Sequence, residues 1–400
     1  MGRHIYVHNP FCVRKCPYCG FFSVTDRSRA EKYYEAAVKE AAFWAEYDKK
    51  YAVPGDSGPD TVYFGGGTPS CVPEAMICGL LEEIRGSFDI GKDAEITLEV
   101  NPASFTSEKG RAYLKSGFNR ISMGIQSLDD GVLKTLGRLH DRQGALKALD
   151  DAFEAGFTNI SADFMTGVPG QTTDGILKDL QTVLDKGVRH ISTYSLMIEE
   201  DTPFYGRYSE TIEDLVPPET ERTMYHEVRR FLNEKGMVPY EISNAAIPGF
   251  ESRHNSSYWD GCDYYAIGAG SHGFLNSVRF GHYEDIDSYI LSSLNIKVDE
   301  VDALLGTEGE TASDIEGFIY FEERLTENGR MREYPFLKLR TTKGIDRDEF
   351  KARFGKDFDE VYAEELRSNI EKGYLKSEGQ KISLTKTGLD FANLVMEDFL

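Results

Sequence analysis

Short runs rich in β-branched and aromatic residues alternate with longer segments of helical periodicity between residue 5 and about residue 244. The expected strands cover residues 5–8, 61–64, 96–100, 120–125, 159–165 and 190–197. Amphipathic stretches lie between them, at residues 30–48, 73–85, 144–155 and 174–186, as helices would. Because parallel strands need crossover connections, this alternation predicts a parallel sheet.

Six strand–helix units are too few for a closed eight-stranded barrel, so the chain is expected to form an α/β fold with an open, partial (βα)6 barrel. In such sheets, ligands bind at the carboxyl ends of the strands. Glycine and polar residues gather where the expected strands end, at residues 65–68, 99–102, 126–127 and 167–171. A ligand site is therefore predicted at that edge.

The remaining chain divides into two further parts. Residues 1–244 are assigned to the α/β core, and residues 245–300 read as a linking segment rich in Tyr, Gly and Ser. Residues 301–400 are predicted to be a mostly helical C-terminal domain. Two short strands around Glu378 and Gly379 give this domain a winged-helix-like character.

The charge balance argues against nucleic acid as a partner. Acidic residues outnumber basic ones by 67 to 45, for a formal charge of −22, which opposes binding to phosphates. No stretch approaches the roughly 20 apolar residues that span a bilayer, and the N-terminus lacks the apolar segment of a signal peptide. We expect a cytoplasmic protein with no integral membrane segment.

Three of the six cysteines cluster near the N-terminus, where Cys12, Cys16 and Cys19 follow the spacing C-x3-C-x2-C. In a reducing compartment, clustered cysteines bind metal or perform redox chemistry more often than they form disulfides. A cubane iron–sulfur cluster needs four ligands, so three in one loop leave one iron open to another molecule. A zinc site is the alternative, with His8 as the nearest candidate for a fourth ligand. Cys71, Cys78 and Cys262 are dispersed and are interpreted as small buried side chains.

This cysteine spacing directly after a first strand resembles the signature of the radical S-adenosylmethionine (SAM) superfamily, whose [4Fe–4S] cluster holds SAM on its open iron. Further segments resemble the oxygen-independent coproporphyrinogen III oxidase-like branch of porphyrin metabolism. They are residues 6–12, 64–70, 120–127, 163–171 and 265–273. The resemblance implies a radical SAM core over residues 1–244, with Cys12, Cys16 and Cys19 as cluster ligands.

The same resemblance implies the residues of the SAM and substrate cavity. They are Tyr6, Tyr18, Gly66, Gly67, Thr68, Glu99, Gln126, Arg138, Asp163 and Met197. Arg138 suits a carboxylate, which it can bind through two hydrogen bonds. Structural interpretations remain open, with the glycines forming a tight turn, the tyrosines packing in the core and the polar residues facing solvent.

Two features resemble the heme chaperone subgroup of this branch. Phe21 stands where the oxidase is expected to carry a further cysteine, and residues 253–259 read Arg-His-Asn-Ser-Ser-Tyr-Trp. Within this segment, His254 is a candidate heme ligand and Arg253 a candidate partner of a propionate; a hydrogen-bonded structural histidine is the alternative for His254. His272 is a weaker candidate ligand.

The subgroup implies a protein that binds heme and passes it to acceptor proteins, with a [4Fe–4S] cluster and SAM as further cofactors. If SAM is cleaved, an electron donor such as a flavodoxin or ferredoxin is a further expected partner. The alternative is a radical SAM enzyme that acts on a tetrapyrrole, such as the oxidase itself. A structural iron–sulfur or zinc protein without SAM is a third hypothesis, but it leaves residues 65–68 and Glu99 unexplained.

Overall fold

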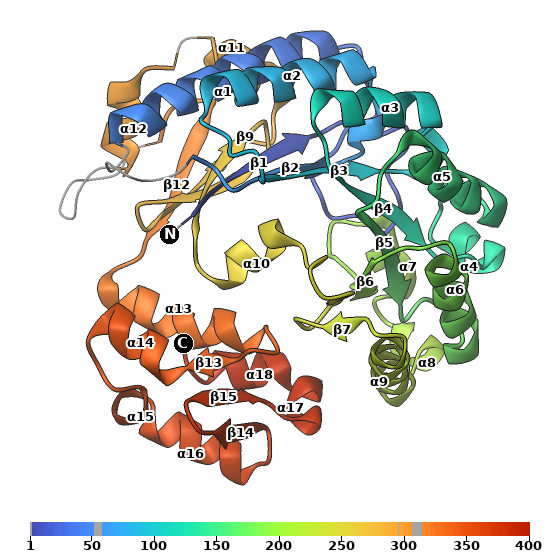
Figure 1. Ribbon diagram of the computed structural model, residues 1–400, viewed down its shortest axis with the longest axis vertical. Coiled ribbons are helices and arrows are strands. Elements are labelled where there is room, and N and C mark those ends of the chain that lie inside the picture. Colours follow the sequence, from blue (N-terminus) through green and yellow to red (C-terminus); the bar gives the residue numbers. More distant parts are fainter. Residues whose placement is uncertain (1, 52–57, 295, 306–313) are drawn as a thin grey trace.

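A computed structural model describes residues 2–51, 58–294, 296–305 and 314–400. The predicted parallel sheet is confirmed: six strands lie side by side in sequence order, each parallel to the next. They are β1 (Arg3–Asn9), β2 (Thr61–Gly66), β3 (Glu95–Val100), β4 (Arg120–Gln126), β5 (Ile160–Thr166) and β6 (His190–Ser195). The sheet curves as an open partial barrel (Figure 1).

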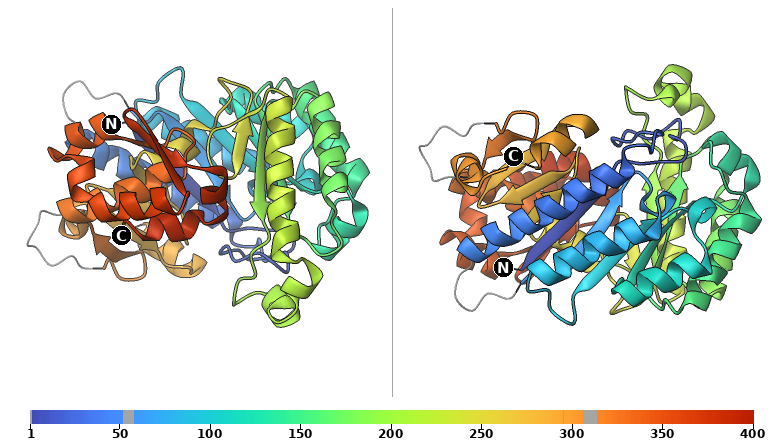
Figure 2. Two further views of the ribbon diagram at one scale, coloured as in Figure 1. Left: turned by 90° about the horizontal axis from the view of Figure 1, so that it is seen from below. Right: turned by 90° about the horizontal axis from the view of Figure 1, so that it is seen from above.

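Helices cover the convex face of the sheet (Figure 1). They are α1 (Ala30–Tyr51), α2 (Glu74–Ser87), α3 (Ser107–Ser116), α4 (Asp130–Thr135), α5 (Arg142–Ala155) and α6 (Thr173–Asp185). The views from above and below show α1 crossing the back of the sheet (Figure 2). Two short 3-10 turns, at Pro69–Cys71 and Pro102–Ser104, follow β2 and β3.

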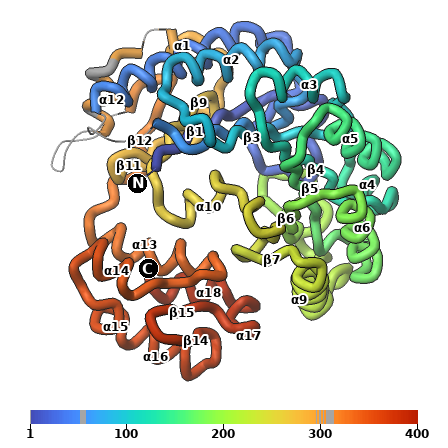
Figure 3. Tube along the Cα trace, in the orientation of Figure 1, coloured from blue at the N-terminus to red at the C-terminus, as the bar shows by residue number. Residues whose placement is uncertain are grey.

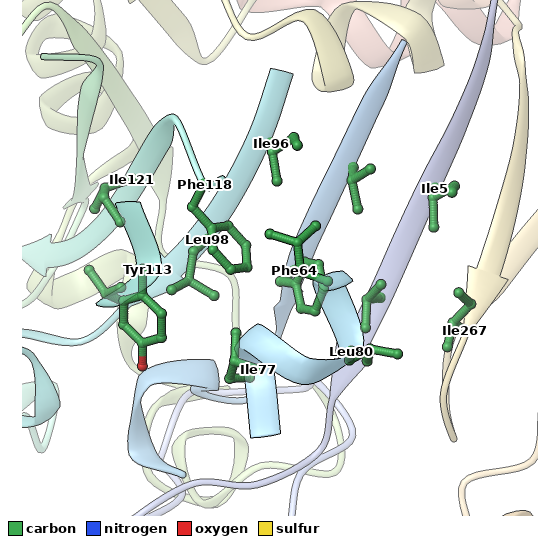
Figure 4. Close-up of a cluster of buried hydrophobic side chains, with 14 of the residues drawn as sticks. Ile5, Phe64, Ile77, Leu80, Ile96, Leu98, Tyr113, Phe118, Ile121 and Ile267 are labelled. Atoms are coloured by element: carbon green, nitrogen blue, oxygen red, sulfur yellow. The ribbon is translucent and has the colours of Figure 1, made fainter. Parts of the chain in front are cut away.

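Alternation along each strand separates the core from the concave face. Ile5, Phe64 and Leu98 are fully buried and point towards Ile77 and Leu80 of α2 (Figure 4). The intervening residues, including Tyr63 and Glu99, face the concave side, where they line a cavity. Because neighbouring side chains of a strand point to opposite faces, one set of strands builds both the core and the site.

The segment expected to link two domains instead extends the main sheet. After α10 (Arg253–Trp259), β9 (Asp263–Ile267) pairs with β1 in parallel, and three antiparallel strands follow it. These are β10 (His272–Leu275), β11 (Val278–His282) and β12 (Ile319–Arg324). Helices α11 (Ile286–Ser292) and α12 (Val298–Leu305) belong to the same region.

The opposite edge of the sheet carries two short strands, β8 (Asn244–Ala246) next to β6 and then β7 (Val238–Pro239). Three helices connect β6 to this edge: α7 (Pro203–Tyr208), α8 (Ile212–Leu215) and α9 (Pro218–Glu234). Within the described ranges, no helix combines the length and apolar character needed to cross a bilayer.

A second core begins near residue 331 and runs to Phe399, so the C-terminal lobe starts later than the expected residue 301. Its elements are α13 (Glu327–Leu339), β13 (Ile345–Asp346), α14 (Arg347–Phe354), α15 (Phe358–Val361), α16 (Ala363–Glu371), β14 (Leu375–Glu378), β15 (Lys381–Leu384), α17 (Lys386–Asp390) and α18 (Ala392–Glu397). The expected hairpin is present, since β14 pairs with β15. The tube view shows this lobe beside α10 (Figure 3).

Contacts with α10 fasten the lobe to the barrel. Lys338 Nζ lies 2.6 Å from Asp260 Oδ1, and the Arg340 guanidinium lies 4.4 Å from the centre of the Trp259 ring, a favourable cation–π geometry. The C-terminal end of α10 is thus held by the lobe.

Candidate functional site

The three clustered cysteines lie in the loop that follows β1, at the carboxyl edge of the sheet. Backbone hydrogen bonds hold this loop, with Cys12 N 2.9 Å from Val24 O and Cys19 N 3.1 Å from Cys16 O. Cys12 is buried, Cys16 and Cys19 are half-buried, and all three are free thiols. The loop therefore presents three thiols in one fixed turn.

The glycine-rich turn after β2 packs directly against the cysteine loop. Gly67 N donates to Asn9 O at 2.7 Å, and Thr68 N donates to Phe11 O at 2.8 Å. A Cβ atom on Gly67 would lie 2.8 Å from Phe11 O and 3.1 Å from Cys12 Sγ. Glycine is therefore required here for close approach.

A cavity of about 620 Å³ opens beside the cysteine loop, within the range of roughly 300–1,000 Å³ that is typical of small-molecule sites. Most of the predicted site residues line it: Tyr18, Cys19, Gly66, Gly67, Thr68, Glu99, Gln126, Arg138, Asp163 and Met197. They come from the carboxyl ends of β2 to β5, the cysteine loop and the loops after β4 and β6, which is the edge predicted from the sequence.

Arg138 connects the cavity to the cluster loop. Its Nη1 lies 3.6 Å from Cys16 Sγ and 3.4 Å from the Tyr18 hydroxyl, and its Nη2 donates to Gly124 O at 2.7 Å. Arg138 thus places a positive charge beside the cysteine loop. Burial raises the pKa of the Cys12 thiol, while a hydrogen bond from Thr68 opposes that change.

Two carboxyl groups stand in the cavity wall in different environments. Burial raises the pKa of Glu99 to about 7, although the Tyr63 hydroxyl donates to it at 2.6 Å. Asp163 accepts hydrogen bonds from Ser122 and Ser161, and burial raises its pKa as well. Glu99 is therefore poised to ionise when a cationic or hydrogen-bonding ligand arrives.

Gln126 occupies a strained backbone position. Its φ is 68°, in the left-handed region that few residues other than glycine adopt. The β4–β5 register shifts between Gly124 and Gln126, which is the mark of a bulge, and bulges often re-aim a side chain next to a site. The bulge ends the strand so that Gln126 lines the cavity.

Cys12 and Cys16 do not line this cavity, and neither do two of the predicted cofactor-binding residues, Tyr6 and His254. The Tyr6 hydroxyl lies 3.1 Å from His8 Nδ1, and the Tyr6 ring stacks on Tyr63. His254 is 1% exposed, and both of its ring nitrogens are hydrogen-bonded, Nδ1 to Thr61 Oγ1 at 2.6 Å and Nε2 to the Tyr258 hydroxyl at 2.9 Å. In this conformation, neither nitrogen of His254 is free to ligate iron.

The position of α10 explains why His254 is enclosed. The backbone N–H groups of Arg253 and His254 donate to the Glu95 carboxylate at 3.1 and 3.0 Å. Glu95 and Thr61 begin β3 and β2, whereas the cysteine loop lies at the other end of the sheet. Helix α10 thus closes the amino end of the barrel, and Arg253, a candidate propionate partner, points its Nη1 at Asp93 O. His272, the weaker candidate, is exposed and bonded to Glu322.

Several cavity residues were not predicted from the sequence. They are Phe21, Tyr63, Asn101, Arg120, Ser122, Met165, Ser192, Tyr194, Ser195, Glu199 and Asn255, among others. The pattern Arg120, Ser122, Gly124 contains the signal for one group, because it places polar residues at every second position of a strand whose alternate residues are apolar. Asn255 carries no such signal, since α10 reaches the cavity only through the fold.

The donor set fits an iron–sulfur cluster, for which cysteine thiolates are the usual ligands. In the part of the chain that the structure describes, no three His, Cys, Asp or Glu side chains converge as ligands of a single metal ion. The cavity beside the loop offers carboxylate, amide and guanidinium groups, which match the ammonium, hydroxyl and carboxylate groups of SAM.

Comparisons with known proteins agree with this geometry. Residues 6–183 match the radical SAM superfamily model, and residues 325–391 match the HemN C-terminal domain. Heme chaperone HemW of Lactococcus lactis is 31% identical, covering 99% of this chain and 96% of its own length. Heme chaperone HemW of Bacillus subtilis is also 31% identical, with coverage of 99% and 98%. The structure of coproporphyrinogen III oxidase (HemN) from Escherichia coli aligns with a TM-score of 0.80 at 21% identity, covering 100% of this chain and 90% of that one. This last likeness shows the fold.

Proposed function

Because this chain belongs to the radical SAM superfamily and, within it, to the heme chaperone HemW family, we propose that it binds heme and transfers it to acceptor proteins while carrying a [4Fe–4S] cluster and SAM. Similarity to named heme chaperones over 99% of the chain carries the proposal. Phe21 supports it, because an exposed aromatic ring at the cavity rim offers an apolar contact in place of a thiol.

The cluster would be held by Cys12, Cys16 and Cys19, with the Arg138 guanidinium 3.6 Å from Cys16 Sγ. When bound, SAM and the cluster together supply one-electron chemistry. The chain's own groups bind and orient: Gly66, Gly67 and Thr68 let a ligand approach the backbone, and Glu99 offers a carboxylate whose proton state changes near neutral pH. The expected partners are heme, a heme acceptor and, if SAM is cleaved, an electron donor, in a cytoplasmic setting.

Hemin titration of the anaerobically purified chain tests the proposal. We expect a Soret band that saturates with hemin, together with iron and sulfide in the protein before hemin is added. Cys12→Ala is the matched variant, since it should remove the cluster and leave hemin binding intact if the two sites are separate. Absence of any hemin-induced band in the wild type contradicts the proposal.

A second candidate function is a radical SAM reaction on a tetrapyrrole, such as oxygen-independent coproporphyrinogen III oxidation. The intact cavity favours it, because a carrier alone has little use for Glu99, Gln126 and Asp163 around a SAM-sized space. The reconstituted protein is supplied with a reductant, SAM and coproporphyrinogen III. Formation of protoporphyrinogen would favour the enzyme over the chaperone.

A further inference from the structure

Arg120 is a buried cation at the amino end of β4, away from the cysteine loop. Its side chain lines the cavity, yet the residue is only 1% exposed. Its Nε is buried without a hydrogen-bond partner, and among the residues that the structure describes no hydrogen bond or ion pair engages its guanidinium. A buried guanidinium without a hydrogen bond or an ion pair is unfavourable, so an anionic ligand that enters the cavity would gain a partner here.

A second unpartnered polar group stands beside it. Thr97 pairs with Arg120 in the β3–β4 register, and its buried Oγ1 has no hydrogen-bond partner among the described residues. On the other side, Tyr63 pairs with Thr97. Three adjacent strands thus present a hydroxyl, a guanidinium and an aromatic ring in one row across the concave face.

Arg120 lies further from the cysteine loop than Gly124 and Gln126 do, whereas Glu99 adjoins this row, since it follows Thr97 by two positions on β3 and accepts a hydrogen bond from Tyr63. Arg120 begins β4 and Gly124 lies four residues further on, a separation of about 13 Å along an extended strand. Asn255 of α10 lines the same cavity, so the cavity continues from the cysteine loop down to the helix that closes the barrel. Arg120 and the cysteine loop therefore border different parts of one continuous cavity.

None of the described neighbours of Arg120 forms a hydrogen bond or an ion pair with its guanidinium. Ser161 and the Tyr240 hydroxyl bond to His190, and burial, followed by the Arg120 charge, holds the pKa of His190 well below its usual value. That histidine is therefore neutral near pH 7. The acidic groups Glu99 and Asp163 lie close enough for the Arg120 charge to lower the pKa of each, although burial raises both overall. Their hydrogen-bond partners are Tyr63 and serine hydroxyls, and neither carboxyl group forms an ion pair with Arg120.

We propose that Arg120 binds a carboxylate group of a ligand that enters this cavity in addition to SAM. A guanidinium binds a planar carboxylate through two parallel hydrogen bonds. Phe21 and Met197, each 68% exposed, and Tyr194, 44% exposed, place apolar surface at the cavity rim beside the exposed Glu199. A cation below this apolar surface suits a ligand with an apolar body and a carboxylate side arm.

The carboxylate has two possible sources, a propionate of heme or a small free carboxylate. The first source rests on the proposed function, whereas the second does not. Both share the same chemistry at Arg120, so the experiment contains one arm for each and a stability measurement that needs neither ligand.

The stability arm compares Arg120→Met with Lys338→Met by thermal unfolding of the ligand-free protein. Lys338 is a buried cation that has partners, Asp260 and Glu349, so Lys338→Met should lower the melting temperature. Arg120→Met removes an unpaired charge and should leave the melting temperature unchanged or raise it. A loss like that of Lys338→Met would mean that Arg120 already has a partner in the folded protein, and would overturn the proposal.

The ligand arms use acetate, hemin and hemin dimethyl ester, in which both propionates are esterified. If the source is heme, hemin should bind Arg120→Met about tenfold or more weakly than wild type, while the diester binds both equally. If the source is a small carboxylate, acetate should stabilise wild type and Arg120→Lys but not Arg120→Met, and hemin should not discriminate.

Two outcomes sink the proposal. Equal responses of wild type and Arg120→Met to acetate, hemin and the diester would remove the carboxylate site. Weaker SAM binding by Arg120→Met, with no effect on the other ligands, would assign Arg120 to SAM instead. Failure of the wild type to bind hemin would count against the proposed function, while the acetate arm would still decide on Arg120.

Discussion

Glu99 is predicted to make the stability of the ligand-free protein depend on pH. Burial raises its pKa from 4.5 to about 7, so between these two values the folded protein binds a proton that the unfolded chain has released. A group of this kind lowers the free energy of unfolding as the pH rises through that window. Glu99→Gln keeps an oxygen that can accept the Tyr63 hydrogen bond and removes the ionisation.

The size of the effect on the free energy of unfolding follows from the change in the pKa of Glu99. Each pKa unit corresponds to about 1.4 kcal/mol, so ionising Glu99 in the folded state costs about 3 kcal/mol once the pH is well above 7. About 2 kcal/mol of this falls between pH 5.5 and pH 8. Over that interval, wild type should lose about 2 kcal/mol relative to Glu99→Gln.

Urea unfolding of SAM-free, cluster-free protein at several pH values measures this difference. Other groups titrate in the same range, so the informative quantity is the gap between wild type and Glu99→Gln at each pH. Glu82→Gln, a substitution at an exposed position of α2, is the matched control and should track the wild type. If the wild-type and Glu99→Gln curves run parallel from pH 5.5 to pH 8, burial does not perturb Glu99 and the reasoning is refuted.

Three further predictions concern the site. Cys12→Ala should abolish iron and sulfide uptake during anaerobic reconstitution. Cys71→Ala, which loses only a hydrogen bond to Phe11 O, should still take up the cluster. Normal iron content in Cys12→Ala would contradict the cluster assignment. Gly67→Ala should also prevent cluster uptake because its Cβ meets Phe11 O, while Gly79→Ala, which meets nothing within 4 Å, should not; equal iron in the two variants would argue against close packing. His254→Ala should lower the free energy of unfolding by about 2–4 kcal/mol. His272→Ala, at an exposed position, should lower it by less than about 0.5 kcal/mol. If both variants match the wild type in chemical denaturation, His254 is not a structural residue.

Periodicity was sufficient to predict the parallel sheet, because each βα unit is local. The addition of β9 to the sheet was not predictable in this way. Its partner, β1, lies more than 250 residues away in the chain, at Arg3 to Val7 against Asp263 to Ile267. Only tertiary packing joins them, and the short run Asp-Tyr-Tyr-Ala-Ile among glycines reads equally well as a loop. The domain boundary moved from residue 301 to about 325 for the same reason, since β12 pairs with β11.

The site was predictable where its residues end strands and less so elsewhere. Glu99 and Gln126 follow from the rule that ligands bind at the carboxyl edge of a parallel sheet, whereas Asp163 lies inside its expected strand and was predicted only from the family resemblance. Arg120 begins its strand, and the same rule directs attention away from it. His254 illustrates the opposite problem, because a histidine in a recognisable motif was a reasonable ligand candidate, but its surroundings supply partners for both ring nitrogens.

The motif at residues 253–259 acquires a physical meaning from the three directions in which its side chains point. His254 is bonded to Thr61 and stacks on Tyr63 at the amino end of the barrel, and its neighbour Asn255 lines the cavity. Trp259, at the other end of the same seven-residue helix, lies under Arg340 of the C-terminal lobe. Helix α10 thus has contacts with the barrel, the cavity and the C-terminal lobe. The motif therefore closes the amino end of the barrel and contributes Asn255 to the cavity that Arg120 lines. It also fastens the C-terminal lobe to the barrel.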